Sequence, residues 1–336
     1  MSADTDPSDH TRPADEDFVI SNAVSVFGDA APGVIVGPGD DAAVFDAGAP
    51  EFVVESCDCA VEEVHFRRRW LSHPAFGARA VGLRAVLCAA SDIAAMGAEP
   101  KTVLLSLGLP PGTTGKTVCD ILDGAREAAA LIGAAVVGGN TSGAPVIFAD
   151  VKVTGFTKGR VFVRNRGAEP GDDIFVTGLV AEAAAEMRAL DTTENAPANG
   201  PGRFSFPEPR VAAGLALCGE RAATAMTDTS DGLLADTEKI ASLSGAGASL
   251  FLERVPVCGR FSGSAEEAVT AGGDYELVFT ARPRMRGVIE GIARRTGVRM
   301  TRIGEVTPPG AGRIRKGGGE VARERFASGG HRHGLS

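Results

Sequence analysis

The chain has 336 residues, of which 44% are hydrophobic and 23% charged, as is ordinary for a soluble globular protein. This length exceeds what one hydrophobic core usually supports, which predicts two domains. The formal net charge of -9 argues against nucleic acid or an anionic membrane surface as the main partner. A small anionic substrate stays open, because a bound cation or a helix N-terminus can outweigh the overall sign locally.

The cysteine pattern and the lack of a targeting segment predict a cytoplasmic protein. The six cysteines lack the spacing of a zinc site and fall mostly in apolar runs, where a free thiol behaves as a small hydrophobe. We find no signal peptide and no apolar run long enough to cross a membrane. Reduced thiols and no membrane partner are therefore expected.

The first predicted ordered feature is an acidic loop at residues 37–44. The preceding residues 1–16 are polar, acidic and without periodicity, which predicts a disordered tail. In the loop, Asp40 and Asp41 follow two glycines and a proline. Adjacent carboxylates repel each other, so a confined loop that holds both indicates a nearby cation such as Mg²⁺. A plain surface turn is the competing interpretation, because Gly and Asp dominate turns.

A buried strand and a buried helix are predicted next. Residues 51–57 read as a strand that ends at Asp58, and His65 follows among apolar neighbours, where a histidine is more often structural than a ligand. Residues 75–96 carry apolar side chains at helical spacing on most of the circumference. Asp92 lies inside this helix, and an unpaired buried carboxylate is costly. A metal or a metal-bound water is a natural partner for it.

The remainder of the first α/β unit ends in a glycine-rich segment. We expect a strand at 102–107, a helix capped by Thr114 and reaching about residue 132, and strands at 134–137 and 146–156. Gly138 to Ser142 would follow the second of these strands, at 134–137. Glycines at a strand end let backbone amides approach a phosphate closely, and Asn140 offers a neutral oxygen ligand.

A boundary is predicted at residues 158–171, and a second α/β unit follows it. We expect strands at 174–177, 275–280 and 303–306, helices ending near 190, at 209–217 and at 288–295, a mobile loop at 191–202, and an uninformative tail from 308 to 336. A short strand also runs into a helix at Asp228 and Asp231. These two carboxylates could cap that helix or hold a metal.

Several motifs occur in an order that identifies a family resemblance. They are Gly39-Asp40-Asp41-Ala42-Ala43, Val64-His65-Phe66, Ser91-Asp92-Ile93-Ala94-Ala95-Met96-Gly97-Ala98, Gly138-Gly139-Asn140-Thr141, Pro170-Gly171-Asp172, Asp228-Thr229-Ser230-Asp231-Gly232-Leu233, Asp274-Tyr275-Glu276-Leu277 and Ile303-Gly304-Glu305-Val306. With them, residues 17–307 resemble the thiamine-monophosphate kinases of the aminoimidazole-ribonucleotide-synthase-like (AIR-synthase-like) superfamily. The resemblance implies ATP- and Mg²⁺-dependent phosphoryl transfer to thiamine phosphate.

The resemblance also implies a fold and an assembly. We expect a two-domain α/β AIR-synthase-like fold with an N-terminal ATP- and Mg²⁺-binding domain at 17–157 and a C-terminal α/β domain at 168–307. The N-terminal domains would pair into a homodimer with a shared barrel. Neither nucleic acid nor membrane is expected as a partner; the partner is a small phosphate acceptor.

Carried over residue by residue, the resemblance implies the site. The expected metal ligands are Asp41, Ser56, Cys57, Asp58, Asp92, Asn140, Asp228 and Asp231, of which Asp58 and Asp231 are also the expected catalytic residues. The expected nucleotide contacts are Gly139, Asn140, Arg164 and Ser230, and the expected substrate contacts are His65 and Gly273. Phosphoryl transfer needs charge neutralisation and in-line positioning more than a covalent group, which suits scattered carboxylates and Mg²⁺.

This chain departs from the family pattern at four places. Asn140 and Gly273 stand where carboxylates are usual, Ala89 replaces an asparagine, and the tail has Gly and His at 330–334 where aromatic residues are usual. The nucleotide half of the motif set is mostly kept, and the thiamine half is not. Two alternatives therefore stay open: a paralogue that uses ATP to activate an amide or carbonyl oxygen of another substrate, and a nucleotide-binding protein without turnover.

Overall fold

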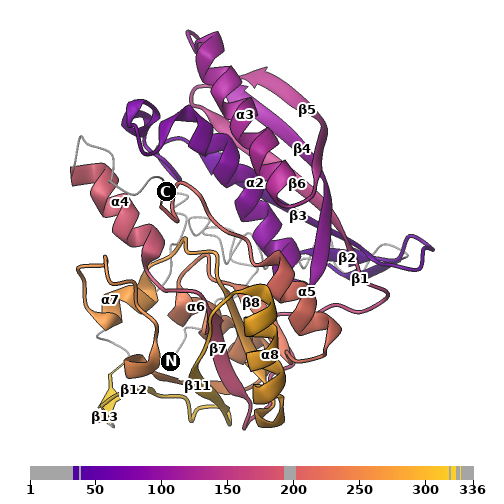
Figure 1. Ribbon diagram of the computed structural model, residues 1–336, viewed down its shortest axis with the longest axis vertical. Helices are drawn as coiled ribbons and strands as arrows, with labels where there is room; N and C mark the ends of the chain where they lie inside the picture. Colours follow the sequence, from indigo (N-terminus) through magenta and orange to yellow (C-terminus); the bar gives the residue numbers. More distant parts are fainter. Residues whose placement is uncertain (1–32, 38, 193–201, 318, 323–325, 327–336) are drawn as a thin grey trace, which may run out of the picture.

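The computed structural model describes residues 33–37, 39–192, 202–317, 319–322 and 326. The predicted disordered tail at 1–16 lies outside these residues, as do most of the predicted loop at 191–202 and residues 327–336 of the tail. No helix within the described ranges is long and apolar enough to cross a membrane. The described chain forms two α/β domains, each built on one mixed sheet, and confirms the predicted fold class (Figure 1).

The first domain is a six-stranded sheet covered on one face by two helices (Figure 1). In spatial order the strands are β1 (Val34–Val36), β2 (Ala43–Phe45), β3 (Val53–Val61), β6 (Phe148–Thr157), β4 (Ala98–Leu109) and β5 (Ala135–Gly143). The helices are α2 (Gly77–Ala95) and α3 (Gly115–Leu131), and a short 3-10 helix, η1 (Arg68–Ser72), precedes α2. The predicted cap is confirmed, because the Thr114 hydroxyl accepts from the Thr117 amide at 3.2 Å.

The second domain is a seven-stranded sheet with helices on both faces. In spatial order its strands are β13 (Gly319–Val321), β12 (Ile314–Lys316), β9 (Gly247–Phe251), β11 (Met300–Thr307), β7 (Asp173–Thr177), β10 (Leu277–Ala281) and β8 (Ala225–Asp228). Its helices are α4 (Glu182–Thr192), α5 (Val211–Gly219), α6 (Leu233–Leu243), α7 (Ala265–Thr270) and α8 (Arg286–Thr296), with short 3-10 turns η2 (Leu252–Arg254) and η3 (Pro283–Met285). Strands β12 and β13 lie in the segment after residue 308, where the sequence pattern predicted no element.

Helix α2 is buried on nearly its whole circumference because it packs against both domains. Glycines make the close contacts feasible: a Cβ added to Gly82 would lie 1.9 Å from the carbonyl oxygen of Ile121 on α3, and one added to Gly214 on α5 would lie 2.0 Å from that of Ala94. Gly97 ends the helix at φ +70°, next to Cys218 of the second domain. The helix therefore fixes the position of Asp92 relative to both sheets.

Two strands run further than predicted. Strand β3 continues to Val61, because it pairs with β6 over its full length, so Asp58 lies within the strand and not at its end. Strand β5 continues to Gly143, because it pairs in parallel with the long strand β4. The expected glycine-rich loop at 138–142 is thus part of a strand at the edge of the sheet.

Candidate active site

A cavity of about 480 Å³ lies where the two domains meet. It is lined by residues from the acidic loop, β3, α2, the β8–α6 connection and the segment before β10. Nine predicted site residues line it: Asp41, Cys57, Asp58, His65, Asp92, Asp228, Ser230, Asp231 and Gly273. The fold therefore gathers side chains that are up to 232 residues apart in the sequence, from Asp41 to Gly273.

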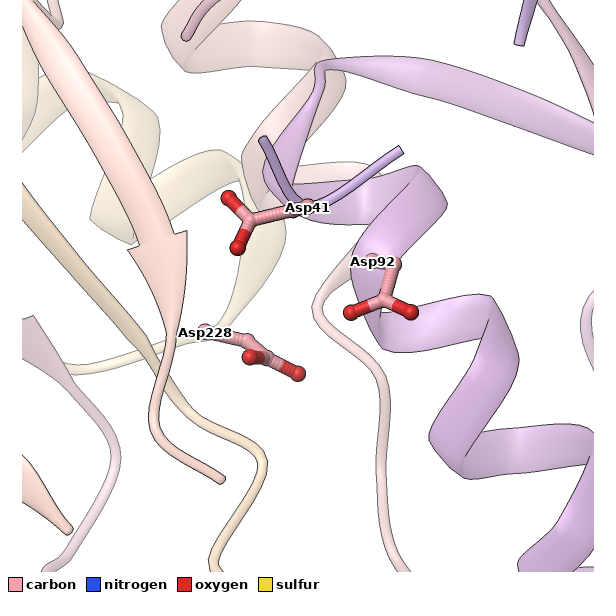
Figure 2. Close-up of side chains that lie close together, drawn as sticks. All are labelled: Asp41, Asp92 and Asp228. Carbon is pink, nitrogen blue, oxygen red and sulfur yellow. The ribbon is translucent and has the colours of Figure 1, made fainter. Parts of the chain in front are cut away.

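Three carboxylates form the centre of this cavity. Asp41 comes from the acidic loop, Asp92 from the last turns of α2 and Asp228 from the end of β8, and Figure 2 shows all three turned toward one shared space. One oxygen of each lies within 4.8 Å of the others. The Thr227 hydroxyl donates a 2.6 Å hydrogen bond to Oδ1 of Asp41, and the Ser56 hydroxyl donates to Oδ2 of Asp92.

The electrostatics of this acidic cluster fit a site for a cation. Burial, and then repulsion between the carboxylates, raises the pKa of Asp228 to about 7 and that of Asp92 well above its ordinary value. Burial likewise raises the pKa of Asp41 to about 6. Oδ2 of Asp41 and Oδ2 of Asp228 are buried and have no hydrogen-bond partner in the described part of the chain. Unpartnered carboxylate oxygens that converge at this distance fit a hard divalent cation such as Mg²⁺.

Two basic side chains flank the acidic cluster. Lys239 on α6 places Nζ 3.7 Å from Oδ1 of Asp41. Burial disfavours its ammonium form, but the neighbouring aspartates outweigh that effect and raise the pKa of Lys239. Arg164, a predicted nucleotide contact, donates from Nε to Asp40 at 3.2 Å and so lies beside the acidic loop. Arg164 therefore lies next to the cavity, because its partner Asp40 directly precedes Asp41 in the acidic loop.

Asp58 and Asp231 line the cavity but are not part of the acidic cluster. Oδ1 of Asp58 accepts a 2.6 Å hydrogen bond from the amide of Cys59. Asp231 lies in the connection between β8 and α6. Helix α6 begins after Gly232, whose amide bonds at 3.1 Å to Asp236 in the first turn. The sequence allowed Asp228 either to cap α6 or to hold a metal. Because Asp228 lies at the end of β8 and the N-cap residue is Gly232, Asp228 does not cap α6.

Cys57 lies within β3 and His65 follows the end of that strand, and both line the cavity. Nδ1 of His65 accepts from the Val61 amide at 3.0 Å, which fixes the ring and leaves Nε2 as the protonated nitrogen. Burial and the nearby Asp150 raise the pKa of Cys57 to about 11, so its side chain is a neutral thiol. Its Sγ lies 3.4 Å from Oδ1 of Asp150. A neutral thiol is a poor ligand for a hard cation.

The segment before β10 contributes backbone and one ring. Gly273 has φ +88° and donates its amide to the Ser230 carbonyl at 2.8 Å. The Asp274 carboxylate accepts from the amides of Ala181, just before α4, and Ala183, in its first turn, so it holds the start of that helix. Tyr275 also has a positive φ, of 53°, and its side chain lines the cavity.

Gly139 and Asn140 lie away from this cavity within the single chain. Both are exposed on β5, the edge strand, and β6 and β4 separate that strand from β3. They line a shallow pocket of about 420 Å³ at the edge of the sheet, together with Leu122 of α3. A Cβ added to Gly139 would lie 1.7 Å from the carbonyl oxygen of Leu105, so close strand pairing already requires glycine there.

Four residues that line the cavity belong neither to the predicted site nor to its motifs: Arg84, Met187, Phe204 and Lys239. Arg84 was detectable, because Arg84, Cys88 and Asp92 recur every four residues and so share a face of α2. The other three gave no signal, since only the folded chain brings them to the cavity. Tyr275 lies in the motif Asp274-Tyr275-Glu276-Leu277, but the sequence predicted no role for it.

Comparisons with known proteins agree with this geometry. Residues 39–161 match the family described as AIR synthase related protein, N-terminal domain, and residues 169–317 match the corresponding C-terminal domain. The chain belongs to the AIR synthase-related family. Within that family it is a homologue of thiamine-monophosphate kinases.

The thiamine-monophosphate kinase of Rhodopirellula baltica is 32% identical to this chain over 294 residues, which cover 82% of this chain and 84% of that protein. The enzyme of Bacillus subtilis is 33% identical over 288 residues, which cover 81% and 86%. Among solved structures, AaThiL complexed with AMPPCP and TMP superposes with a TM-score of 0.76 at 26% identity, covering 95% of this chain and 97% of that one. This chain therefore shares both of its domains with these kinases.

Proposed function

We propose that the protein is a Mg²⁺-dependent thiamine-monophosphate kinase, which transfers the γ-phosphoryl group of ATP to thiamine phosphate. The observation that carries the proposal is the acidic cluster of Asp41, Asp92 and Asp228 in a cavity between the domains. The comparisons also support the proposal, because relatives that match over four-fifths of the chain are thiamine-monophosphate kinases. The paralogue alternative is favoured only by the departures on the thiamine side, which are Gly273 and the tail sequence without aromatic residues.

In this proposal each group has a limited task. The acidic cluster would hold Mg²⁺, with Asp58 and Asp231 next to it, and the ion would supply charge neutralisation for the phosphates of ATP. Ser56 and Thr227 orient two of the carboxylates by hydrogen bonds. Arg164 and Ser230 would contact the nucleotide. His65 and the backbone of Gly273 would contact the acceptor, because both line the same cavity.

We further propose that the protein is a homodimer joined through the edge strand β5. Five large apolar residues on β5 and on its neighbours β4 and α3 are exposed: Leu104, Leu122, Leu131, Val136 and Val137. Among the described strands β5 pairs only with β4, so the backbone groups on its other side have no partner strand there. A symmetric partner would cover them. Gly139 and Asn140, which lie on the same strand, would then act across the dimer interface on the partner's nucleotide.

The test of the kinase proposal is product formation by the purified full chain. With ATP, Mg²⁺ and thiamine phosphate, thiamine diphosphate and ADP should appear in equal amounts, and EDTA should stop both. ADP formation without thiamine diphosphate would point to another acceptor and contradict the proposal. MgATP binding without either product would support the alternative of a nucleotide-binding protein without turnover.

A further inference from the structure

Arg84 lines the cavity, and its guanidinium forms no ion pair with a carboxylate of the described residues. Arg84 is 6% exposed in the middle of α2. No Asp or Glu of the described chain lies within ion-pair distance of it, and its hydrogen bond to a described residue runs from Nη1 to the Phe204 carbonyl. A guanidinium has five N–H donors, and a buried charge without a counter-charge is costly. The remaining N–H donors of Arg84 are therefore available to bind an anion in the cavity.

The position of Arg84 along α2 gives the cavity two oppositely charged ends. Arg84 and Asp92 are eight residues apart on one helix face, which separates their Cα atoms by about 12 Å at 1.5 Å per residue. The acidic cluster is at one end and Arg84 is at the other. The carboxylates would repel a phosphate group unless a cation lies between them. A phosphate bound between the two ends could face a metal ion on one side and the guanidinium on the other.

Aromatic rings hold the Arg84 guanidinium in a fixed plane. Its central carbon lies 3.9 Å from the ring centroid of Phe204 and 6.0 Å from that of Tyr275. Phe204 is itself held by Trp70 and Phe76, at centroid distances of 5.4 and 5.9 Å. Stacking leaves the edge of the guanidinium, where its N–H groups lie, for an oxyanion. The side chain is therefore preorganised for a phosphate group.

From these contacts we propose that Arg84 binds the phosphate monoester of the acceptor substrate, which makes it a specificity-determining residue for the phosphorylated acceptor over its dephosphorylated form. The inference rests on the proposed kinase function. The terminal phosphates of ATP have the same oxyanion chemistry and are the other source of such a ligand. They would lie with Mg²⁺ at the acidic end, so we assign the acceptor phosphate to Arg84.

Calorimetric binding to the full chain separates these sources, with thiamine phosphate, thiamine and MgAMPPCP as three ligands. In Arg84→Gln, thiamine phosphate should bind about 10- to 100-fold more weakly, as expected for loss of a charge-assisted hydrogen bond. Affinities for thiamine and MgAMPPCP should change less than about twofold. Arg79→Gln is the matched control on the same helix, because Arg79 is exposed and pairs with Glu127 at the surface. It should leave all three affinities unchanged.

Two other results would overturn the inference. Loss of MgAMPPCP affinity with thiamine phosphate unaffected would assign Arg84 to the nucleotide. An equal loss for all three ligands would mean that Arg84 only supports the Phe204 segment. Phe204→Leu keeps the guanidinium and removes the ring, so it should retain the preference for thiamine phosphate over thiamine. Arg84→Lys, which keeps the charge, is the second variant if Arg84→Gln does not fold, and it should lose thiamine phosphate affinity to an intermediate degree. An unchanged preference for thiamine phosphate in Arg84→Lys would contradict the role given to the edge of the guanidinium.

The wild-type protein distinguishes failure of this inference from failure of the kinase proposal. If the wild type forms no thiamine diphosphate and binds thiamine as well as thiamine phosphate, the proposed function is wrong. If the wild type prefers thiamine phosphate and Arg84→Gln keeps that preference, the function stands and the role of Arg84 is wrong.

Discussion

The hydroxyl of Thr227 donates a 2.6 Å hydrogen bond to Oδ1 of Asp41, and this bond joins the second domain to the acidic loop of the first. Oδ2 of the same carboxylate is buried and has no partner among the described residues. One oxygen is thus oriented by the protein while the other stays available to a ligand. The relative position of the two domains therefore determines the geometry of the acidic cluster.

The first prediction tests this hydrogen bond. Thr227→Val keeps the side-chain shape but removes the donor, so Asp41 loses its orientation across the domain boundary. We expect MgAMPPCP to bind roughly tenfold more weakly by calorimetry, which corresponds to about 1.4 kcal/mol, with little change in thermal stability. Thr296→Val on α8 also removes a hydroxyl hydrogen bond, to the Ile292 carbonyl, but far from the cavity. Equal effects of the two variants would contradict the assigned role of Thr227.

The second prediction concerns the pH dependence of stability without metal. The pKa of Asp41 is about 6 and that of Asp228 about 7, against an ordinary value of 3.8. Between pH 4 and 7 the folded chain therefore holds more protons than the unfolded chain, and the free energy of unfolding falls as pH rises through this window. In EDTA, the midpoint of thermal unfolding should decrease from pH 5 to pH 8. Excess Mg²⁺ should reverse most of the loss at pH 8.

A control for this pH profile lies in the second domain. Burial raises the pKa of Asp274 to about 7 as well, although two backbone hydrogen bonds oppose the shift. Asp274→Asn should remove its part of the pH dependence and leave the Mg²⁺ effect intact. The double variant Asp41→Asn, Asp228→Asn should make the profile less steep and abolish the Mg²⁺ effect, while Asp92, Asp236 and Asp274, whose pKa values are also raised by burial, keep the remaining slope. A stability that rises from pH 5 to pH 8 in EDTA would contradict the pKa shifts.

The third prediction separates the acidic cluster from its neighbours. Asp228→Asn removes one of three buried like charges, so above pH 7 it should raise the thermal stability of the metal-free protein and eliminate stabilisation by MgAMPPCP. From the sequence we predict that Asp58→Asn and Asp231→Asn also remove Mg²⁺-dependent ATP binding while the fold persists. Calorimetry on all three variants tests both statements. Unchanged MgATP affinity in Asp58→Asn and Asp231→Asn would restrict the metal site to the acidic cluster.

The sequence indicated which carboxylates the fold brings together, but not the full length of the strands around them. Asp92 could be singled out because burial of an unpaired charge is costly whatever the detailed fold, as within an apolar helix. The glycine-rich segment at 138–142 was expected to be a loop and is part of β5, because glycine serves both a phosphate loop and a close strand contact, and only the pairing of β5 with β4 distinguishes them. Lys239 gave no signal, because its importance arises from proximity to Asp41 across the domain boundary.

The fourth prediction tests the dimer. Val137 on β5 is 60% exposed at the proposed interface. Val137→Asp should give a monomer by light scattering at micromolar concentration, since a charge buried at an interface without a partner is costly. Leu243→Asp is a matched control, because Leu243 is 44% exposed at the end of α6 in the other domain. A monomeric wild type, or a Val137→Asp variant that stays dimeric, would contradict the proposed interface.

The last prediction concerns the acceptor side of the cavity, where Gly273 replaces the carboxylate that is usual in the family. Loss of a charge-assisted hydrogen bond there, together with the aromatic contacts absent from the tail sequence, should weaken thiamine phosphate by on the order of 10²- to 10³-fold relative to a site that has both. A high KM for thiamine phosphate with a normal KM for ATP is the expected result. A low-micromolar KM with efficient formation of thiamine diphosphate would contradict this expectation.

The structure has room for a carboxylate at position 273, so the substitution of Gly273 can be tested in the reverse direction. A Cβ added to Gly273 would meet only Ala183, at 3.7 Å, so a side chain has room in the cavity. The positive φ of 88° carries a strain cost, although Asp and Asn tolerate left-handed backbone better than most residues. Gly273→Asp should lower the KM for thiamine phosphate about tenfold and leave MgATP affinity unchanged. Gly273→Asn separates charge from shape, and Gly297→Asp, at φ +70° in open space, reports the backbone cost alone. Equal KM values for Gly273→Asp and Gly273→Asn would show that a carboxylate at this position does not contact the acceptor.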